Sequence, residues 1–221
     1  MWDNATIMML IKETGTTLYM TLTSTFFAYC IGLPMGIFLV ITAKDGLRPN
    51  AVTYKILDVI ANIVRSVPFL ILLMLLIPFT RFVVGKSYGA TATIVPLTVA
   101  AAPFIARLVE SSLLEVDRGV VEAAQSMGAS TGTIVWKVFL GEARTSLIAG
   151  ATIALGTILG YSAMAGAVGG GGLGDVAIRY GYYRYQADIM IVTVILLVIL
   201  VQILQYIGTR MSKKLDKRIT G

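Results

Sequence analysis

The feature that most constrains this chain is a pair of stretches, 14–43 and 145–174, that each run for 30 residues without Asp, Glu, Lys or Arg. Shorter uncharged stretches cover 66–80, 87–106 and 189–209. A helix needs about 20 residues to cross the hydrocarbon core of a bilayer. A soluble domain of 221 residues has no means of covering two such stretches. The sequence therefore predicts an integral membrane protein.

We expect an all-α fold with five transmembrane helices. The stretch at 66–80 is short, but it becomes long enough to span if its helix begins near Ile56. Composition agrees with this class, since 57% of residues are hydrophobic and 14% are charged. Soluble proteins have about 45–50% and about 25%, respectively. The expected spans cover residues 16–41, 56–79, 88–109, 146–168 and 187–209.

The distribution of Lys and Arg predicts the orientation, because cytoplasmic loops of membrane proteins carry most of these residues. Five spans place thirteen of the 18 basic residues on the side of the C-terminus and five on the other. The N-terminus is therefore expected outside and the C-terminus inside, with 210–221 as a basic cytoplasmic tail. The net charge of +6 then reflects topology rather than nucleic-acid binding. A headgroup anchor and a recruiter of anionic lipid or RNA remain alternatives for the tail.

Several enzyme classes are excluded by composition. The chain has no His, which removes His-dependent acid–base and nucleophilic sites and His-ligated metals. Its single cysteine, Cys30, lies in an apolar stretch and forms no disulfide within the chain. We expect a transport protein rather than an enzyme, with no metal site. An ion-driven carrier is the rival class, although such carriers usually place ionisable groups deep in the membrane and four of the spans have none at their centres.

Between the third and fourth spans lies a polar segment that is too charged to cross the membrane. It reads as two short helices separated by a break, over residues 117–140. Asp117 is expected to cap the first helix, Gly128 to end it in the left-handed conformation, and Ser130 to cap the second. Amphipathic periodicity alone leaves two uses open, a passive interfacial loop and a surface for a soluble partner.

Within this segment, Glu122-Ala123-Ala124 is followed by Gly128 and Ser130. The pattern resembles the EAA loop of permeases from binding-protein-dependent ABC importers, with Gly141 in place of the family's Pro. The resemblance implies that these five residues belong to a coupling helix that inserts into a cleft on a separate ATPase subunit. Glu122 would then offer a charge-assisted contact to that subunit, while the small alanines allow close approach.

Further motifs resemble the methionine importers of this family, over roughly 12–208. They are Asn62–Phe69, Ile94–Thr98, Ala102–Arg107, Gly160–Gly169 and Gly172–Gly174. The resemblance implies a type I permease domain in the cytoplasmic membrane of a prokaryote. It also implies a homodimer, two ATPase subunits, an external methionine-binding protein, and L-methionine, in many members also D-methionine, as substrate. The chain itself would bind no cofactor, because ATP is used by the partner. A permease for another amino acid or small solute is the alternative.

The fourth span is rich in small residues, and two uses of it remain open. In the first, the helix lines the translocation path or the dimer axis, and the lining residues are Gly160, Ser162, Met164 and Gly166. In the second, the side chains of this helix are small because it packs closely against its neighbours. The following glycine-rich stretch, 169–174, is expected to form a flexible external turn or a hinge.

Arg65 and Arg107 are expected at the cytoplasmic ends of their helices, with Glu110 one turn after Arg107. Snorkelling to the headgroups or an intramolecular ion pair explains them simply. A contact that changes between inward-facing and outward-facing states is the other interpretation.

Overall fold

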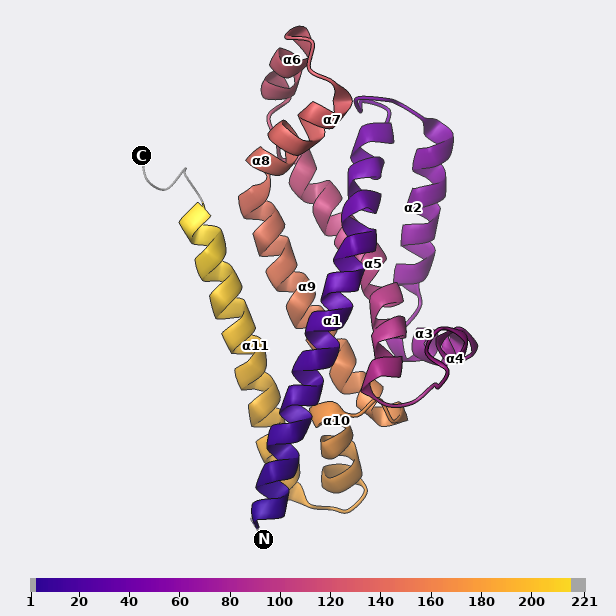
Figure 1. Cartoon of the computed structure of the whole chain (residues 1–221), viewed down its shortest axis with the longest axis vertical. Coiled ribbons are helices and arrows are strands. Elements are labelled where there is room, and N and C mark those ends of the chain that lie inside the picture. Colours follow the sequence, from indigo (N-terminus) through magenta and orange to yellow (C-terminus); the bar gives the residue numbers. More distant parts are fainter. Residues whose placement is uncertain (1–2, 216–221) are drawn as a thin grey trace.

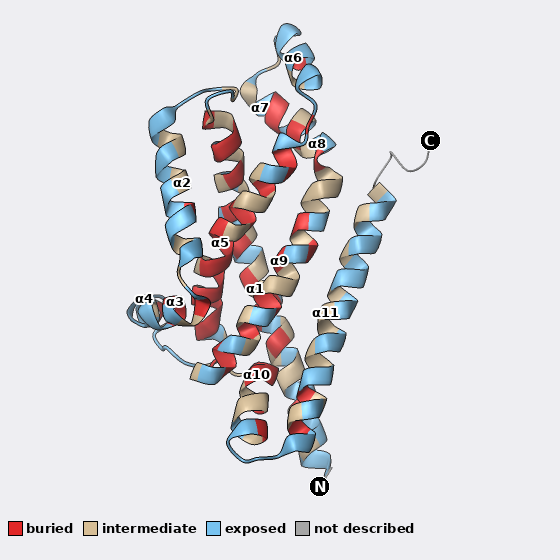
Figure 2. Ribbon diagram, turned by 180° about the vertical axis from the view of Figure 1, so that it is seen from behind, coloured by how far each residue is buried: buried red, intermediate tan, exposed pale blue. Residues whose placement is uncertain are grey.

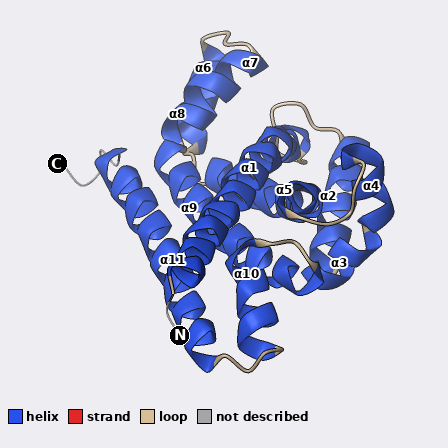
Figure 3. Ribbon diagram, turned by 60° about the horizontal axis from the view of Figure 1, so that its bottom comes forward, coloured by secondary structure: helices blue, strands red, loops and turns tan. Residues whose placement is uncertain are grey.

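The computed structural model describes residues 3–215, and in this range the chain forms helices and connecting turns without a strand (Figure 3). Residues 210–215 of the expected basic tail belong to α11, and residues 216–221 lie outside the described residues. Four described helices are long and apolar enough to cross a membrane, which confirms the all-helical membrane class. They are α1 (Asn4–Thr42), α5 (Ala90–Leu114), α9 (Arg144–Ala165) and α11 (Ala187–Leu215).

The expected second span is not one continuous helix. Residues 56–79 instead fall on α2 (Ala51–Ser66), α3 (Phe69–Leu75) and the start of α4 (Ile77–Val84). The axes of α2 and α3 differ by 105°. The break follows from Pro68, which has no N–H to donate and forces Val67 into an extended conformation with φ −83° and ψ 126°. The prediction of one helical span over 56–79 is corrected accordingly, because the segment is divided among three helices.

α1 begins at Asn4, well before the expected start at residue 16. Asp3 caps it, because its carboxylate accepts a hydrogen bond from the Thr6 N–H at 2.9 Å. The helix therefore carries Lys12 and Glu13 in a part that extends beyond the uncharged stretch. This extension places a carboxylate at the end of the bundle that holds the N-terminus (Figure 1).

α5 forms the centre of the bundle and is buried along most of its length, whereas α2 and α11 are largely exposed (Figure 2). It remains one helix despite Pro96 and Pro103. α1 packs closely on α5, and two of its glycines make this approach possible. A Cβ atom at Gly32 would lie 2.6 Å from the carbonyl oxygen of Ala102, and one at Gly36 would lie 2.6 Å from that of Ala106.

The connecting segments gather at the two ends of the bundle (Figure 1). One end holds the α1–α2 turn, the α6 (Arg118–Ser126), α7 (Thr131–Thr133) and α8 (Leu140–Glu142) segment, and the C-terminal end of α11. The other end holds the start of α1, α3, α4 and α10 (Gly172–Val176). The 117–140 segment and the glycine-rich turn therefore lie at opposite ends of the molecule.

Candidate functional site

The 117–140 segment folds by local rules that its sequence predicts. The Asp117 side chain accepts hydrogen bonds from the N–H groups of Gly119 and Val120 at 2.8 and 3.3 Å, and α6 begins at the next residue. The predicted N-cap is therefore confirmed. An Asp at this position satisfies donors that the first helical turn leaves unpaired.

The break between the two helices is a Schellman motif centred on Gly128. The Ala129 N–H donates to the carbonyl of Ala124 at 3.1 Å, and the Gly128 N–H donates to that of Gln125 at 2.9 Å. Gly128 has φ +78°, a conformation in which a Cβ is strained. Ser130 then caps α7, accepting from the Thr133 N–H at 3.2 Å. The predicted roles of Gly128 and Ser130 in the local fold are confirmed.

The two helices pack on each other through one small residue. Ala124 is buried and belongs to the same apolar cluster as Ile134, Val135 and Phe139 of the π-helical turn Ile134–Phe139. Ile134, Val135 and Phe139 thus form an apolar stripe of the second helix that faces α6. Because caps and apolar packing both connect the helices, the 117–140 segment is built as one unit with a set angle between its parts.

The outer surface of this unit carries Glu122 and Ala123, which are both exposed. It also carries two large apolar side chains, Met127 at 82% and Trp136 at 72% exposure. Sequence reasoning missed these two, although Trp136 stands outside the apolar stripe of its helix and so faces away from the core. Exposed apolar side chains beside a carboxylate are typical of a contact surface for another protein.

A cleft of about 1090 Å³ lies between the α1–α2 turn, α2 and α6. Glu122 and Gln125 line it from α6, and Tyr54 and Asp58 line it from α2. The edge of α6 that bears Glu122 therefore borders open space rather than packed side chains. This leaves room beside α6 for movement or for a group from another chain.

The four candidate path residues do not share one environment. Gly160 and Met164 are exposed, whereas Ser162 is buried and donates its hydroxyl to the carbonyl of Leu159 at 2.7 Å. Gly166 is buried against the start of α10, where an added Cβ would collide with the backbone of Asp175. Close packing therefore explains Ser162 and Gly166, and only the other two belong to an open face of α9.

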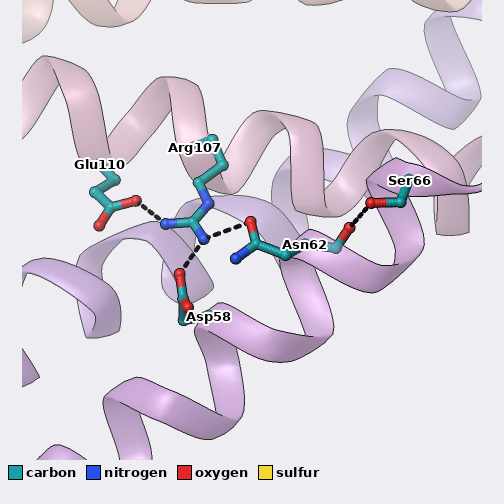
Figure 4. Close-up of polar contacts among 5 residues, drawn as sticks. All are labelled: Asp58, Asn62, Ser66, Arg107 and Glu110. Atoms are coloured by element: carbon teal, nitrogen blue, oxygen red, sulfur yellow. Dashed lines mark hydrogen bonds and ion pairs between the residues drawn. The ribbon is translucent and has the colours of Figure 1, made fainter.

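A second polar cluster connects α2 to α5 and was only partly predicted (Figure 4). The Arg107 guanidinium donates to Glu110 at 2.7 Å and to Asn62 at 3.0 Å, and it forms an ion pair with Asp58. The pair with Glu110 was visible as a one-turn spacing in the sequence. The pairing with α2 was not, because Asp58 precedes Arg107 by 49 residues. We call these four residues the Arg107 cluster.

Arg65 is exposed and lies in the last turn of α2, the end of that helix away from the α1–α2 turn (Figure 1). The expectation that Arg65 lies at the same end of the bundle as the 117–140 segment is corrected accordingly, because α2 begins at that end and runs away from it. Among the described residues it forms no ion pair. The described part of the chain likewise contains no group of three His, Cys, Asp or Glu side chains placed to hold a metal.

These observations define an integral membrane protein whose apolar helix bundle carries a polar two-helix unit at one end. The model of the family described as "Binding-protein-dependent transport system inner membrane component" matches residues 32–221. The chain belongs to this family. Its members are permease subunits, and ATP hydrolysis in such systems resides in a separate subunit.

Named relatives and solved structures agree with this placement. The probable D-methionine transport system permease protein MetI of Vibrio cholerae is 51% identical over 95% of this chain and 93% of its own length. The methionine import system permease protein MetP of Bacillus subtilis is 44% identical, covering 81% of each chain. A solved structure of inward facing conformations of the MetNI methionine ABC transporter superimposes with a TM-score of 0.96, at 48% identity, over 98% of this chain and 100% of that one.

Proposed function

We propose that this chain is the membrane-spanning permease subunit of an ATP-driven importer that moves methionine into the cytoplasm by alternating access. The observation that carries the proposal is the match to methionine permeases over almost the whole chain, at 51% identity for the Vibrio cholerae relative. The names of that relative and of the Bacillus subtilis protein support methionine, in the D- as well as the L-form, as substrate.

The permease domain over 12–208 would cross the membrane five times, with the N-terminus outside and the C-terminus inside. α1, α5, α9 and α11 supply four crossings, and the bent pair α2–α3 supplies the other. Charge supports this orientation. The α1–α2 turn and the 117–140 segment, which contain Lys44 and Lys137, lie at one end of the bundle (Figure 1). The α4–α5 connection and the segment after α10, which contain Lys86 and Arg179, lie at the other end.

The 117–140 segment would be the coupling segment that contacts the ATPase. Its folding as one unit supports this role, because a rigid unit transmits movement of a partner to the helices on either side, α5 and α9. Glu122 and Ala123 would touch the ATPase directly, as would Met127. Ala124, Gly128 and Ser130 would act indirectly by setting the angle between the two helices. The cleft beside Glu122 supports a surface that changes its packing during the cycle.

The complete importer would contain two copies of this chain, two ATPase subunits and an external methionine-binding protein, in the cytoplasmic membrane of a prokaryote. The exposed face of α9 supports a second copy and a path between the copies. Along it the exposed or half-exposed residues recur at helical spacing, and they are Ile153, Thr157, Gly160 and Met164. Gly160 and Met164 would therefore line the path or the dimer axis.

Uptake of labelled L-methionine tests the proposal, in cells that lack their own importer. The chain is expressed alone, and then with the ATPase and binding protein encoded beside it. We expect uptake only from the full set, and its loss when ATP hydrolysis is blocked. Uptake by the chain alone would support an autonomous carrier instead. A complex that hydrolyses ATP but takes up no methionine would indicate a permease for another amino acid or small solute.

A further inference from the structure

The external end of α1 holds the start of α10 by two hydrogen bonds from side chains. The Glu13 carboxylate accepts from the Gly172 N–H at 2.8 Å, and the Thr17 hydroxyl accepts from the Leu173 N–H at 2.9 Å. These partners are separated by 159 and 156 residues in the sequence. We call this arrangement the external contact. It satisfies backbone donors that a helix start leaves unpaired.

The glycine-rich turn before α10 packs on several helices at once. The Gly169 carbonyl accepts from the N–H of Gly89, directly before α5, at 2.9 Å. A Cβ at Gly172 would lie 2.7 Å from the Thr17 hydroxyl, and one at Gly174 would collide with the backbone of Ala163 in α9. The turn, for which the sequence left open a flexible external turn or a hinge, therefore connects the outer ends of α1, α5 and α9 in this structure.

An ion pair stabilises the segment that Glu13 contacts. Arg179 forms an ion pair with Asp175 of α10. The hydrogen bond to Asp175 raises the pKa of the Arg179 guanidinium above its ordinary value, and the Glu13 carboxylate adds a smaller electrostatic effect. Glu13 thus bonds to a backbone donor of the segment after α9, and the same segment carries the Arg179–Asp175 ion pair.

We propose that Glu13 and Thr17 are positioning residues of the transport cycle, which hold the 166–174 turn against α1 in the inward-facing state and release it when the outer end opens. This inference rests on the proposed function. The chain superimposes with a TM-score of 0.96 on a structure titled as inward facing, which supports assigning the external contact to that state.

The chemistry of the external contact suits a reversible role. A backbone N–H that leaves a carboxylate or hydroxyl can pair with water instead, so breaking the two hydrogen bonds has a small net cost. Leu173 is buried in one apolar cluster with Leu10 of α1, and exposing that cluster adds the larger part of the cost of release. The turn is also able to change its backbone, because Gly169, Gly171 and Gly172 all have φ near +80°. Glycine moves between positive and negative φ values without the steric cost that a Cβ would add.

Hydrogen exchange of the 166–176 segment tests the inference in the full importer, with both ATPase subunits present. In the wild type we expect slow exchange at Gly172 and Leu173 without nucleotide, and exchange about tenfold faster or more when ATP and vanadate hold the ATPases closed. Equal protection in the two states would overturn the proposal, because it would make the external contact a fixed structural feature.

Variants supply a second, functional measurement. Glu13→Ala should raise ATP hydrolysis in the absence of the binding protein several-fold, because it favours the open outer end. Glu13→Gln should remain close to wild type, since the amide oxygen still accepts the bond. Thr17→Val should also raise ATP hydrolysis, but less than Glu13→Ala. Thr16→Val is the matched control, because the Thr16 hydroxyl donates within α1, to the Lys12 carbonyl at 3.0 Å.

Two outcomes separate this inference from the proposed function. If the wild-type complex fails to take up methionine but its 166–176 protection still changes with nucleotide, the substrate is wrong and the external contact stands. If uptake is normal and Glu13→Ala matches the wild type in ATP hydrolysis and exchange, the proposed function stands and the inference is overturned.

Discussion

Arg107 of α5 forms an ion pair with Asp58 of α2, and this pair is the main polar connection between the two helices. α2 buries only Ala61 among its 16 residues, so apolar packing contributes little to its attachment. The side chains of Arg107 and Asp58 are 20% and 31% exposed, so both groups are half-buried. Because α5 leads directly to the 117–140 segment, the pair links that segment to α2.

The Arg107 cluster predicts that the stability of the complex depends on the charge at residue 107. Arg107→Met leaves the carboxylates of Asp58 and Glu110 without their cation, and we expect the purified complex to lose about 1 kcal/mol or more of stability. Exchanging the charges, as Arg107→Asp with Asp58→Arg, should recover part of the loss. Thermal unfolding of the detergent-solubilised importer measures both. Arg65→Met is the control, and an equal loss from it would show that the effect is not specific to this cluster.

The backbone of Gly128 predicts a defect in coupling rather than in folding. A Cβ at this position meets open space, so Gly128→Ala is strained only through its φ of +78°, by about 1–2 kcal/mol. We expect the angle between α6 and α7 to change and uptake per ATP hydrolysed to fall several-fold. Gly128→Asn should be milder, because Asn tolerates this conformation better. Gly132→Ala, in the adjacent helix without a positive φ, should behave as the wild type.

The exposed carboxylate of Glu122 predicts a loss of communication with the ATPase. Glu122→Arg reverses the charge at the surface proposed to dock, so uptake should fall at least tenfold while expression and membrane insertion remain normal. Glu122→Gln should reduce uptake less than Glu122→Arg. Co-purification of the ATPase and labelled-methionine uptake are measured together. Normal uptake by Glu122→Arg at normal expression would falsify the assignment of Glu122 to this contact.

The two environments on α9 predict different reactivity toward thiol reagents. In a Cys30→Ser background, Met164→Cys should react with a water-soluble methanethiosulfonate and lose uptake, because residue 164 is 49% exposed. Ser162→Cys is nearly isosteric and should resist, because residue 162 is 1% exposed. Methionine added first should slow the reaction at residue 164 if this face lines the path. Equal reactivity at both positions would contradict the division of α9 into two faces.

Local features of this chain were predictable from sequence. Asp117, Gly128 and Ser130 act on residues at most five positions away, so residue type and spacing determine their roles. The uncharged stretches likewise predict helices that cross a membrane, because hydropathy and length decide this directly. The family resemblance carried by Glu122-Ala123-Ala124 also extended to the whole chain.

Contacts between distant helices were not predictable in the same way. The ion pair of Arg107 with Asp58, and the bond from Gly172 to Glu13, depend on how helices pack, and a single sequence does not specify that packing. The bend at Val67–Pro68 was missed for another reason. Proline is tolerated inside α5 at Pro96 and Pro103, so its presence alone does not distinguish a broken helix from a continuous one.

The position of Asp58 also has a consequence for biosynthesis. The ribosome produces Asp58 49 residues before Arg107, so α2 enters the translocation machinery before its cationic partner exists. With only Ala61 buried, the nascent helix has little to keep it against α1. Stable docking of α2 must therefore await the insertion of α5, which makes the order of helix assembly differ from the order of synthesis.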